Sequence, residues 1–379
     1  MTRTLYLIAG EESGDILGGR LMQALAARDP KIRFVGIGGL RMQEAGLKSS
    51  LFPMRELSLM GLAEVLPSIF RLKRRLDETV ADIEATNPAA LVTIDAPGFT
   101  LRVAARVHGS LPVIHYVAPQ VWAWRRGRAR KVARIVDRLL CLLPFEPPVF
   151  QAEGLDARFV GHPVLESGMD RGDGARFRAA HGIASDAPLV AVLPGSRRAE
   201  VSRLLPSIFE TLRRLDRPGL RVVVPTVAAV EQAVRAAPWP VEPIFVPAAG
   251  ERADALAAAT SALCKSGTAT LEVALAGCPM LVLYRLNPLT SLIVRNIITV
   301  RFASLVNLLA DRAVAPEFLQ EYCNPDLIAP QLARLLDDSS AREAQRAGFR
   351  EALAKLAAPG GMAPSEAAAE AVLDALSAR

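Results

Sequence analysis

Short apolar runs that end in glycine-containing turns recur along this 379-residue chain, and each is followed by a segment whose apolar residues repeat with helical spacing. In the first half these runs are "TLYLIAG", "RFVGIGG", "ALVTID" and "PVIHYVA". Helices are expected at about 15–27, at 40–45 and from about Thr100. Strands that alternate with helices in this way indicate βαβ units, in which the strands run parallel in one sheet.

The same alternation restarts at "PLVAVLPGS", which predicts a second α/β half of similar construction. Its further strands are expected at "RVVVPTV", "PIFVPA", "SALCKSG" and "PMLVLYR", with helices at about 199–215, 251–259 and 268–276. The halves join near 163–187, which is rich in glycine, aspartate and proline. We therefore expect domains at 1–165 and 166–345, a helical segment at 346–379 that packs back, and a ligand in the cleft between the domains.

Composition excludes several classes of protein. Hydrophobic residues make up 51% of the chain and charged residues 22%, so a large core is expected rather than extended disorder. The four cysteines and four histidines lack the spacing of metal ligands or of a disulfide scaffold. The most apolar long stretch, 289–309, is interrupted by Arg295 and Arg301, and no secretory signal precedes the acidic "EESGD". We expect a cytoplasmic protein.

Two turns of the second half suit an anionic ligand. In "LPGSRRAEV" a strand ends and Ser196 and Arg197 open a helix, where backbone N–H groups and forked positive charge favour phosphate. In "CKSGTATLE" Ser266, Gly267 and Thr268 follow the next such strand. Two turns of this kind fit a diphosphate better than one phosphate does. An ordinary strand-to-helix turn with solvated arginines would give the same "LPGSRRAEV" pattern.

Two charged residues flank the second turn. Glu272 lies one helical turn after Thr268, and because a carboxylate repels phosphate, we expect it to face a ribose diol. A solvated glutamate on an alanine-rich helix is the alternative. Lys265 precedes the turn and is expected to point away from the ligand in a structural role.

Acidic residues follow two strands of the first half. "AGEESGD" places Ser13, Gly14 and Asp15 after the first strand in a pattern that is neither a dinucleotide fingerprint nor a Walker loop, and that suits hydroxyl groups of a sugar. Ser13 as a helix cap is the alternative. Asp95 ends a buried strand in "VTIDAPGF", where a carboxylate can accept a proton from an attacking hydroxyl. A turn-capping aspartate before Pro97 would look the same.

Basic clusters account for the net charge of +6 and favour anionic partners. "YVAPQVWAWRRGRARKVAR" combines two tryptophans with many arginines, and we expect it to bind an anionic head group or lipid phosphate rather than nucleic acid. "MGLAEVLPSIFRLKRRL" predicts a basic amphipathic helix that dips into an anionic membrane surface. Its membrane-facing residues are expected to be Leu62, Val65, Leu66, Ile69, Phe70, Arg71 and Lys73. A core-facing helix with a solvated basic face is the alternative.

Taken together, these motifs resemble the lipid-A-disaccharide synthases, a glycosyltransferase family of GT-B architecture. The matching stretches run in family order across nearly the whole chain: "AGEESGD", "FVGIGG", "MGLAEVL", "IDAPGF", "YVAPQVWAWR", "FVGHPV", "LPGSR", "CKSGTATLE", "GCPMLVLYR" and "EFLQEYC". The resemblance implies two Rossmann-like domains whose parallel sheets face each other across a cleft. It assigns the acceptor and the membrane to the N-terminal domain and the UDP-sugar to the C-terminal domain.

The resemblance also implies a reaction. The donor would be UDP-2,3-diacylglucosamine, the acceptor 2,3-diacylglucosamine 1-phosphate, and the products a β-1,6-linked disaccharide 1-phosphate and UDP. Asp95 would be the general base, Arg197 and the turn from Ser266 to Thr268 would hold the diphosphate, and Glu272 would lie at the ribose. Asn307 and Gln320 would border the nucleotide. The chain departs from the family at Gly98, where an acid is common, and at Val306 and Asp311, where Pro and Gly are usual.

The chemistry of these residues predicts a single inverting displacement without a metal or other cofactor, because arginine and fixed backbone dipoles can carry the leaving-group charge. The absence of a D-x-D pattern agrees with this expectation. The resemblance places the protein peripherally on the cytoplasmic face of the inner membrane. Two other functions compete: a UDP-sugar 2-epimerase of the same fold, and a lipid- or nucleic-acid-binding protein without catalysis, in which loss of the Asp95 carboxylate would leave function intact.

Overall fold

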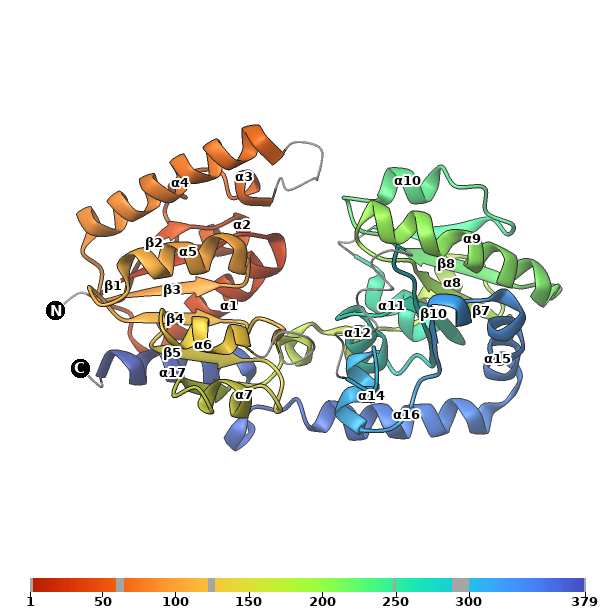
Figure 1. The fold of residues 1–379 in the computed structure, drawn as a ribbon. Helices are drawn as coiled ribbons and strands as arrows, with labels where there is room; N and C mark the ends of the chain where they lie inside the picture. Colours follow the sequence, from red (N-terminus) through yellow and green to blue (C-terminus); the bar gives the residue numbers. More distant parts are fainter. Residues whose placement is uncertain (1–2, 59–64, 122–126, 248–249, 288–299, 378–379) are drawn as a thin grey trace. The chain divides into compact units, whose positions relative to one another are not determined.

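A computed structural model describes residues 3–58, 65–121, 127–247, 250–287 and 300–377, and the chain divides into two compact units (Figure 1). The first comprises residues 1–163 and 356–379, and the second residues 164–355. The boundary expected after residue 165 thus lies two residues from that of the structure.

The expected join at 163–187 is largely an ordered part of the second unit. Helix α8 (Gly174–Ala180) packs against α11 (Arg252–Ala258), where the guanidinium of Arg178 donates to the Ala258 carbonyl at 2.8 Å. The C-terminal segment begins later than residue 346, because α16 (Ser339–Ala354) still belongs to the second unit. The side-chain oxygen of Gln345 in α16 accepts the Met280 N–H at 2.8 Å, and its amide nitrogen donates to the Met280 carbonyl at 3.2 Å. These two bonds hold α16 against the second unit.

The first unit contains a six-stranded parallel sheet in the order β2-β1-β3-β4-β5-β6. The strands are β1 (Thr4–Ala9), β2 (Arg33–Ile37), β3 (Ala90–Ile94), β4 (Val113–Tyr116), β5 (Arg138–Cys141) and β6 (Asp156–Phe159). The four apolar runs of the sequence form β1 to β4, so the predicted parallel βαβ units are confirmed. β5 and β6, which were not predicted from the sequence, extend the sheet.

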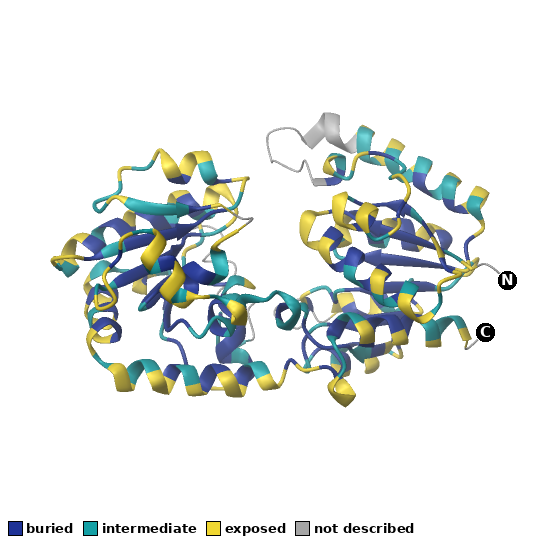
Figure 2. Cartoon of the chain, turned by 180° about the vertical axis from the view of Figure 1, so that it is seen from behind, coloured by how far each residue is buried: buried dark blue, intermediate teal, exposed yellow. Residues whose placement is uncertain are grey.

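Helices cover both faces of this sheet. They are α1 (Glu12–Arg28), α2 (Leu40–Glu44), α3 (Arg55–Ser58), α4 (Val65–Thr86), α5 (Pro97–Val107), α6 (Gly127–Ala133), α7 (Pro147–Gln151) and α17 (Pro364–Ser377). One core lies between the sheet and α1 with α17, and the other between the sheet and α4 to α7. Buried strands therefore lie between helices with exposed outer faces (Figure 2). Helix α5 begins at Pro97 rather than at Thr100, because proline is favourable in a first helical turn.

Helix α17 is attached to the first sheet through a buried arginine. The Arg138 guanidinium donates to Asp156 at 2.7 Å and to the carbonyl of Ala371 in α17 at 2.6 Å, and its side chain is 8% exposed. Replacing Arg138 by alanine removes both bonds and leaves a cavity, so we expect a loss of about 2–4 kcal/mol in the free energy of unfolding. Urea denaturation measures this loss. Arg158→Ala is the matched control, because Arg158 also binds Asp156 but is 39% exposed, and a loss below about 1 kcal/mol is expected. Equal losses in the two variants would contradict the assignment.

The second unit contains another six-stranded parallel sheet, in the order β12-β11-β10-β7-β8-β9. Its strands are β7 (Leu189–Leu193), β8 (Arg221–Pro225), β9 (Pro243–Val246), β10 (Ser261–Lys265), β11 (Met280–Tyr284) and β12 (Glu317–Leu319). Five of these strands lie at the predicted runs, and the three-residue edge strand β12 was not predicted. The fold class, two α/β halves with parallel sheets, is confirmed.

The other helices that are described in the second unit flank its sheet. Besides α8, α11 and α16, they are α9 (Arg198–Leu215), α10 (Glu231–Arg235), α12 (Ala269–Leu275), α14 (Leu305–Ala310) and α15 (Pro325–Asp337). Short 3₁₀ turns lie at Pro163–Glu166, Met169–Arg171, Gln320–Tyr322 and Pro359–Gly361. Within the described part of the chain, no helix has both the length and the apolar character that a membrane crossing requires.

Candidate active site

Asp95 lies directly after β3, at the carboxyl end of the first sheet. Asp95 and Ala96 both have left-handed backbone conformations, with φ values of 50° and 46°. Two consecutive non-glycine residues in this region are strained, and such strain is concentrated at functional sites. The Asp95 carboxylate accepts the Ala96 N–H at 2.8 Å, its one hydrogen bond among the described residues, and burial raises the pKa of this carboxyl. Asp95 is half-buried, and a carboxylate that is partly removed from water and accepts few hydrogen bonds is a stronger proton acceptor than a fully exposed one.

The turn after β1 is adjacent to Asp95. A side chain at Gly10 would come within 2.5 Å of the Ala96 side chain, and one at Gly14 within 3.4 Å of the Ile94 carbonyl. The structure therefore brings the "AGEESGD" and "IDAPGF" motifs together. Ser13 is exposed in the first turn of α1, and its side chain does not cap the helix, whose N-cap residue is Glu11.

Asp15, expected to bind substrate, has a structural position instead. It is 4% exposed, and its carboxylate accepts the backbone N–H groups of Gly39, Arg41 and Met42 at 2.7, 2.9 and 3.1 Å. These are the free N–H groups at the start of α2, which an anion stabilises. Both carboxylate oxygens are occupied by this role, which connects α1 to α2.

The turn between β7 and α9 presents Ser196 and Arg197, as expected. Arg197 is the N-cap residue of α9, and its side chain is 79% exposed. The N–H groups of Ser196 and Arg197 point at a carboxylate of the protein itself, because Oε2 of Glu200 accepts both, at 3.2 and 3.3 Å. Gly195 has a φ of 120°, and a side chain there would come within 2.7 Å of the same Oε2 atom. Glu200 was not recognised from the sequence, although an acid at the third helical position is the capping-box signal.

The turn between β10 and α12 lies beside the first turn, because β7 and β10 are neighbouring parallel strands with Leu193 paired to Cys264. Gly267 has a φ of 147°, which favours glycine, and Thr268 is the N-cap residue of α12. The Ser266 hydroxyl donates to the Ala303 carbonyl at 2.7 Å. The two turns therefore lie side by side at one edge of the sheet.

Lys265 does not point away from these turns, contrary to expectation. Its Nζ atom lies 3.0 Å from Oε1 of Glu200, and a side chain at Gly267 would come within 3.5 Å of it. The same ammonium lies 5.4 Å from the centre of the Tyr284 ring. The four-carbon side chain of Lys265 extends back over the turn. Lys265 therefore bridges the two candidate phosphate turns.

Glu272 is paired with an arginine that sequence reasoning missed. Arg252, the first residue of α11, donates from Nη2 to Oε2 of Glu272 at 2.5 Å, and the two side chains are 17% and 32% exposed. Glu272 is thus not the solvated residue of the alternative interpretation. Nothing local in the sequence indicates this partner, which lies 20 residues upstream.

Asn307 is buried and supports the site rather than lining it. Its side chain donates to the Ala315 carbonyl and to Glu317 at 2.7 and 2.8 Å, and it accepts the N–H groups of Val314 and Ala315 at 2.8 and 2.9 Å. Glu317 in turn accepts the N–H of Ala303, whose carbonyl receives the Ser266 hydroxyl. This network corrects the expectation of direct nucleotide contact by Asn307.

Two further positions in this region can be placed. Gln320 is half-buried with a φ of 54°, and its side-chain oxygen accepts the N–H of Leu286 at 3.0 Å, so the amide nitrogen is the part that it could present to a ligand. Asp311 adopts the left-handed conformation at the end of α14, with a φ of 53°.

The predicted membrane-facing segment is described only in part. Leu62 lies outside the described residues, and of Val65, Leu66 and Ile69 only the helical backbone of α4 is described. Phe70 is 75% exposed, and Lys73 is exposed beside it, whereas Arg71 is half-buried. Arg75 is structural, because it forms two bonds to Glu56 of α3 at 2.8 and 2.9 Å. The tryptophans of "WAWR" also lie outside the described residues.

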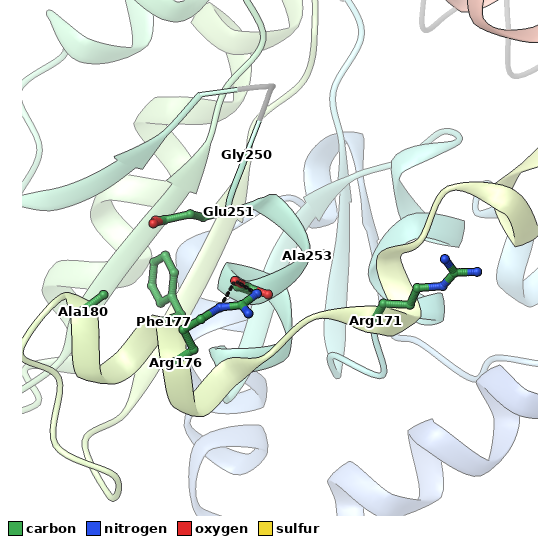
Figure 3. Close-up of a pocket in the computed structure, with 8 residues that line it drawn as sticks. Arg171, Arg176, Phe177, Ala180, Gly250, Glu251 and Ala253 are labelled. Atoms are coloured by element: carbon green, nitrogen blue, oxygen red, sulfur yellow. Dashed lines mark hydrogen bonds and ion pairs between the residues drawn. The ribbon is translucent and has the colours of Figure 1, made fainter. Parts of the chain in front are cut away.

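A groove in the first unit and a cavity in the second are among the hollows that the described residues form. In the first unit a groove of about 510 Å³ follows the end of β2 and combines apolar side chains (Leu40, Phe52, Met54) with basic ones (Lys48, Arg55). In the second unit a cavity of about 450 Å³ lies between α8 and α11. There the Arg176–Asp254 ion pair, with a 2.6 Å N–O distance, closes one side, and the Arg171 guanidinium extends away from it (Figure 3). No residue of the expected site lines this cavity.

Comparison with known proteins gives the family. The sequence profile described as lipid-A-disaccharide synthetase matches residues 5–371. A lipid-A-disaccharide synthase of Rhodospirillum centenum is 51% identical over 99% of this chain and 95% of its own. The calicheamicin glycosyltransferase CalG4 superimposes with a TM-score of 0.59 at 17% identity, covering 99% of this chain and 98% of its own. The UDP-GlcNAc 2-epimerase of Neisseria meningitidis, bound to UDP-GlcNAc, gives 0.62 at 11% identity, covering all of both chains.

The two structural matches establish only that the fold is the one shared by GT-B glycosyltransferases and these epimerases. The sequence matches are stronger evidence, because they extend over almost the full length of the chain and include every motif described above. This chain belongs to the lipid-A-disaccharide synthetase family.

Proposed function

We propose that the protein transfers 2,3-diacylglucosamine from its UDP donor to the 6-hydroxyl of 2,3-diacylglucosamine 1-phosphate. The products are the β-1,6-linked disaccharide 1-phosphate and UDP. The observation that carries this proposal is the 51% identity with a lipid-A-disaccharide synthase over 99% of the chain. Members of this family are glycosyltransferases, so a UDP-sugar donor and a glucosamine-derived acceptor follow from membership. The acyl chains and the 1-phosphate are the finer part of the proposal.

In this reaction Asp95 is the general base. Its carboxylate takes the proton of the acceptor hydroxyl while the hydroxyl oxygen attacks the anomeric carbon of the donor. The bond from that carbon to UDP breaks, and its electron pair leaves with the diphosphate. One displacement inverts the anomeric configuration. The burial that raises the pKa of Asp95 supports this role, because a base with a higher pKa accepts the proton more readily.

The second unit binds the leaving group. Arg197 supplies a mobile positive charge at the start of α9, and the turn from Ser266 to Thr268 adds backbone N–H groups. Ser196, Gly267 and Gln320 border the same ligand. Glu272, held by Arg252, faces the ribose hydroxyls. The backbone N–H groups of the second turn are fixed before the substrate arrives, which lowers the cost of stabilising the charge that develops on UDP.

The first unit binds the acceptor and contacts the membrane. The groove after β2 supports this assignment, since its apolar side chains suit acyl chains while Lys48 and Arg55 suit a phosphate. Ser13 and Gly14 are assigned to the sugar hydroxyls, which the approach of Gly14 to Ile94, the residue before Asp95, supports. The exposed Phe70 and Lys73 of α4 support peripheral binding to the anionic cytoplasmic face of the inner membrane.

Product analysis tests the proposal against its rivals. Purified protein is incubated with UDP-2,3-diacylglucosamine, with and without the 1-phosphate acceptor, and the products are identified by mass spectrometry. We expect a disaccharide 1-phosphate and UDP in equal amounts, formed only when the acceptor is present. UDP release that ignores the acceptor, or a donor epimerised at C2, would sink the proposal in favour of a hydrolase or an epimerase.

A further inference from the structure

The ends of three neighbouring strands of the second sheet converge on one lysine. Lys265 ends β10, Glu200 belongs to the helix that follows β7, and Tyr284 ends β11. The Lys265 ammonium lies 3.0 Å from Glu200 and 5.4 Å from the Tyr284 ring centre. The Lys265 and Glu200 side chains are only 20% and 16% exposed, so this ion pair is largely removed from water.

Glu200 occupies the position of an anion at the start of α9. Its Oε2 atom accepts the N–H groups of Ser196 and Arg197, while its Oε1 atom binds Lys265. A phosphate bound to the same N–H groups would have to take the place of this carboxylate, because two anions that share the donors repel each other. Lys265 is the cation of the pair and is close enough to Gly267 to reach a ligand over either turn.

We propose that Lys265 is a diphosphate-binding residue that exchanges Glu200 for the diphosphate of the donor. Without a ligand, Glu200 neutralises Lys265 and holds the Ser196–Arg197 turn in shape. With UDP or the UDP-sugar bound, the ammonium binds a phosphate oxygen, and Glu200 loses its place at the N–H groups. This inference rests on the proposed function and adds a second cation, beside Arg197, to the groups that hold the leaving group.

A purely structural lysine would behave differently. If Lys265 served only to bind Glu200, then removing either charge would break the same ion pair, and both variants would change UDP affinity in the same direction. In the exchange that we propose, Lys265 attracts the diphosphate and Glu200 competes with it. The two variants must then change the affinity in opposite directions.

Calorimetric titration with UDP separates these cases. Lys265→Met is expected to weaken UDP binding by about tenfold or more, as for loss of a charge-assisted hydrogen bond. Glu200→Gln keeps an oxygen that accepts the backbone N–H groups but loses the negative charge, so we expect binding to become about two- to fivefold tighter. Uridine, which lacks phosphate, should bind both variants as it binds the wild-type protein.

Two control variants test whether any effect on UDP affinity is local to Lys265 and Glu200. Arg213→Met and Glu210→Gln remove the same charges farther along α9 and should leave UDP affinity within about twofold. Equal UDP affinities for Lys265→Met and the wild-type protein, a parallel loss in Lys265→Met and Glu200→Gln, or an equal loss for uridine would each overturn the inference alone. A wild-type protein that neither binds UDP nor forms the disaccharide would overturn the proposed function as well.

Discussion

Asp95→Asn is expected to lower kcat by about 10²- to 10⁴-fold, which is the usual contribution of a general base. Asparagine has nearly the same shape, and its side-chain oxygen can still accept the Ala96 N–H, but it cannot take the proton of the acceptor. Binding of UDP should be unchanged, because the residues that we assign to UDP belong to the other unit. Steady-state kinetics with both substrates, together with UDP titration, measure the two effects.

The same substitution should raise stability at neutral pH. Burial raises the pKa of Asp95 in the folded state, so folding disfavours its charged form. Below the pKa that Asp95 has in the unfolded chain, the carboxyl is protonated in both states and its contribution to stability is fully present. This contribution is lost as the pH rises through the raised pKa of the folded state. A neutral asparagine avoids this loss, and Asp95→Asn should have an equal or higher Tm at pH 7–8. In the wild-type enzyme, activity should fall as pH falls through the raised pKa.

Asp77→Asn is the matched control for this prediction. Asp77 lies in the same unit and is 51% exposed in a surface ion pair with Arg106. Its replacement should change neither kcat nor the pH profile. An Asp95→Asn variant with wild-type kcat would remove Asp95 from the mechanism and favour the binding-protein alternative. An inactive variant with a clearly lower Tm would indicate a structural role instead.

Arg197→Met is expected to lower kcat/KM by about 10²- to 10³-fold, the cost of losing one group that stabilises the negative charge that develops on the leaving group. The Arg197 guanidinium is 79% exposed, and its ion pair with Oε1 of Glu200 is long, at 3.9 Å, so the guanidinium is accessible to a diphosphate. For the same reason its loss should leave the free energy of unfolding unchanged within about 0.5 kcal/mol. Kinetics and urea denaturation of the one variant measure both quantities.

Arg213→Met tests whether the effect of Arg197 is local. Arg213 lies on the same helix, about 24 Å away at 1.5 Å per residue, and pairs with Glu210. Both variants lower the net charge of the protein by one unit, but only Arg197→Met should impair transfer. A comparable loss in the two variants would mean that long-range electrostatics, and not contact with the leaving group, accounts for the role of Arg197.

The sheets could be predicted from the sequence because buried parallel strands are continuous apolar runs bounded by glycine turns. Leu189–Leu193 and Ala90–Ile94 are of this kind. The missed strands are short and contain charged residues, such as Arg138 in β5 and Asp156 in β6. Arg138 and Asp156 form an ion pair with each other, and Arg138 also donates to the backbone of α17. Both partners of Arg138 are distant from it in the sequence.

The site was predictable only to the level of its backbone turns. Strand ends and glycines place Asp95, Gly195 and Gly267, but side-chain partners depend on segments that are distant in sequence. Asp15 caps a helix that begins 25 residues later, and Arg252 meets Glu272 across two loops. Lys265 shows the same limit, because alternation along a strand predicts the direction of its first carbon atoms and not the position of its ammonium group.

The configuration of the new glycosidic bond tests the central claim most directly. Wild-type protein is given the α-linked UDP-2,3-diacylglucosamine and the 1-phosphate acceptor, and the product is examined by NMR. A single displacement assisted by Asp95 predicts a β linkage to the 6-hydroxyl and one UDP for each disaccharide. An α linkage, or consumption of the donor without a disaccharide, would contradict it.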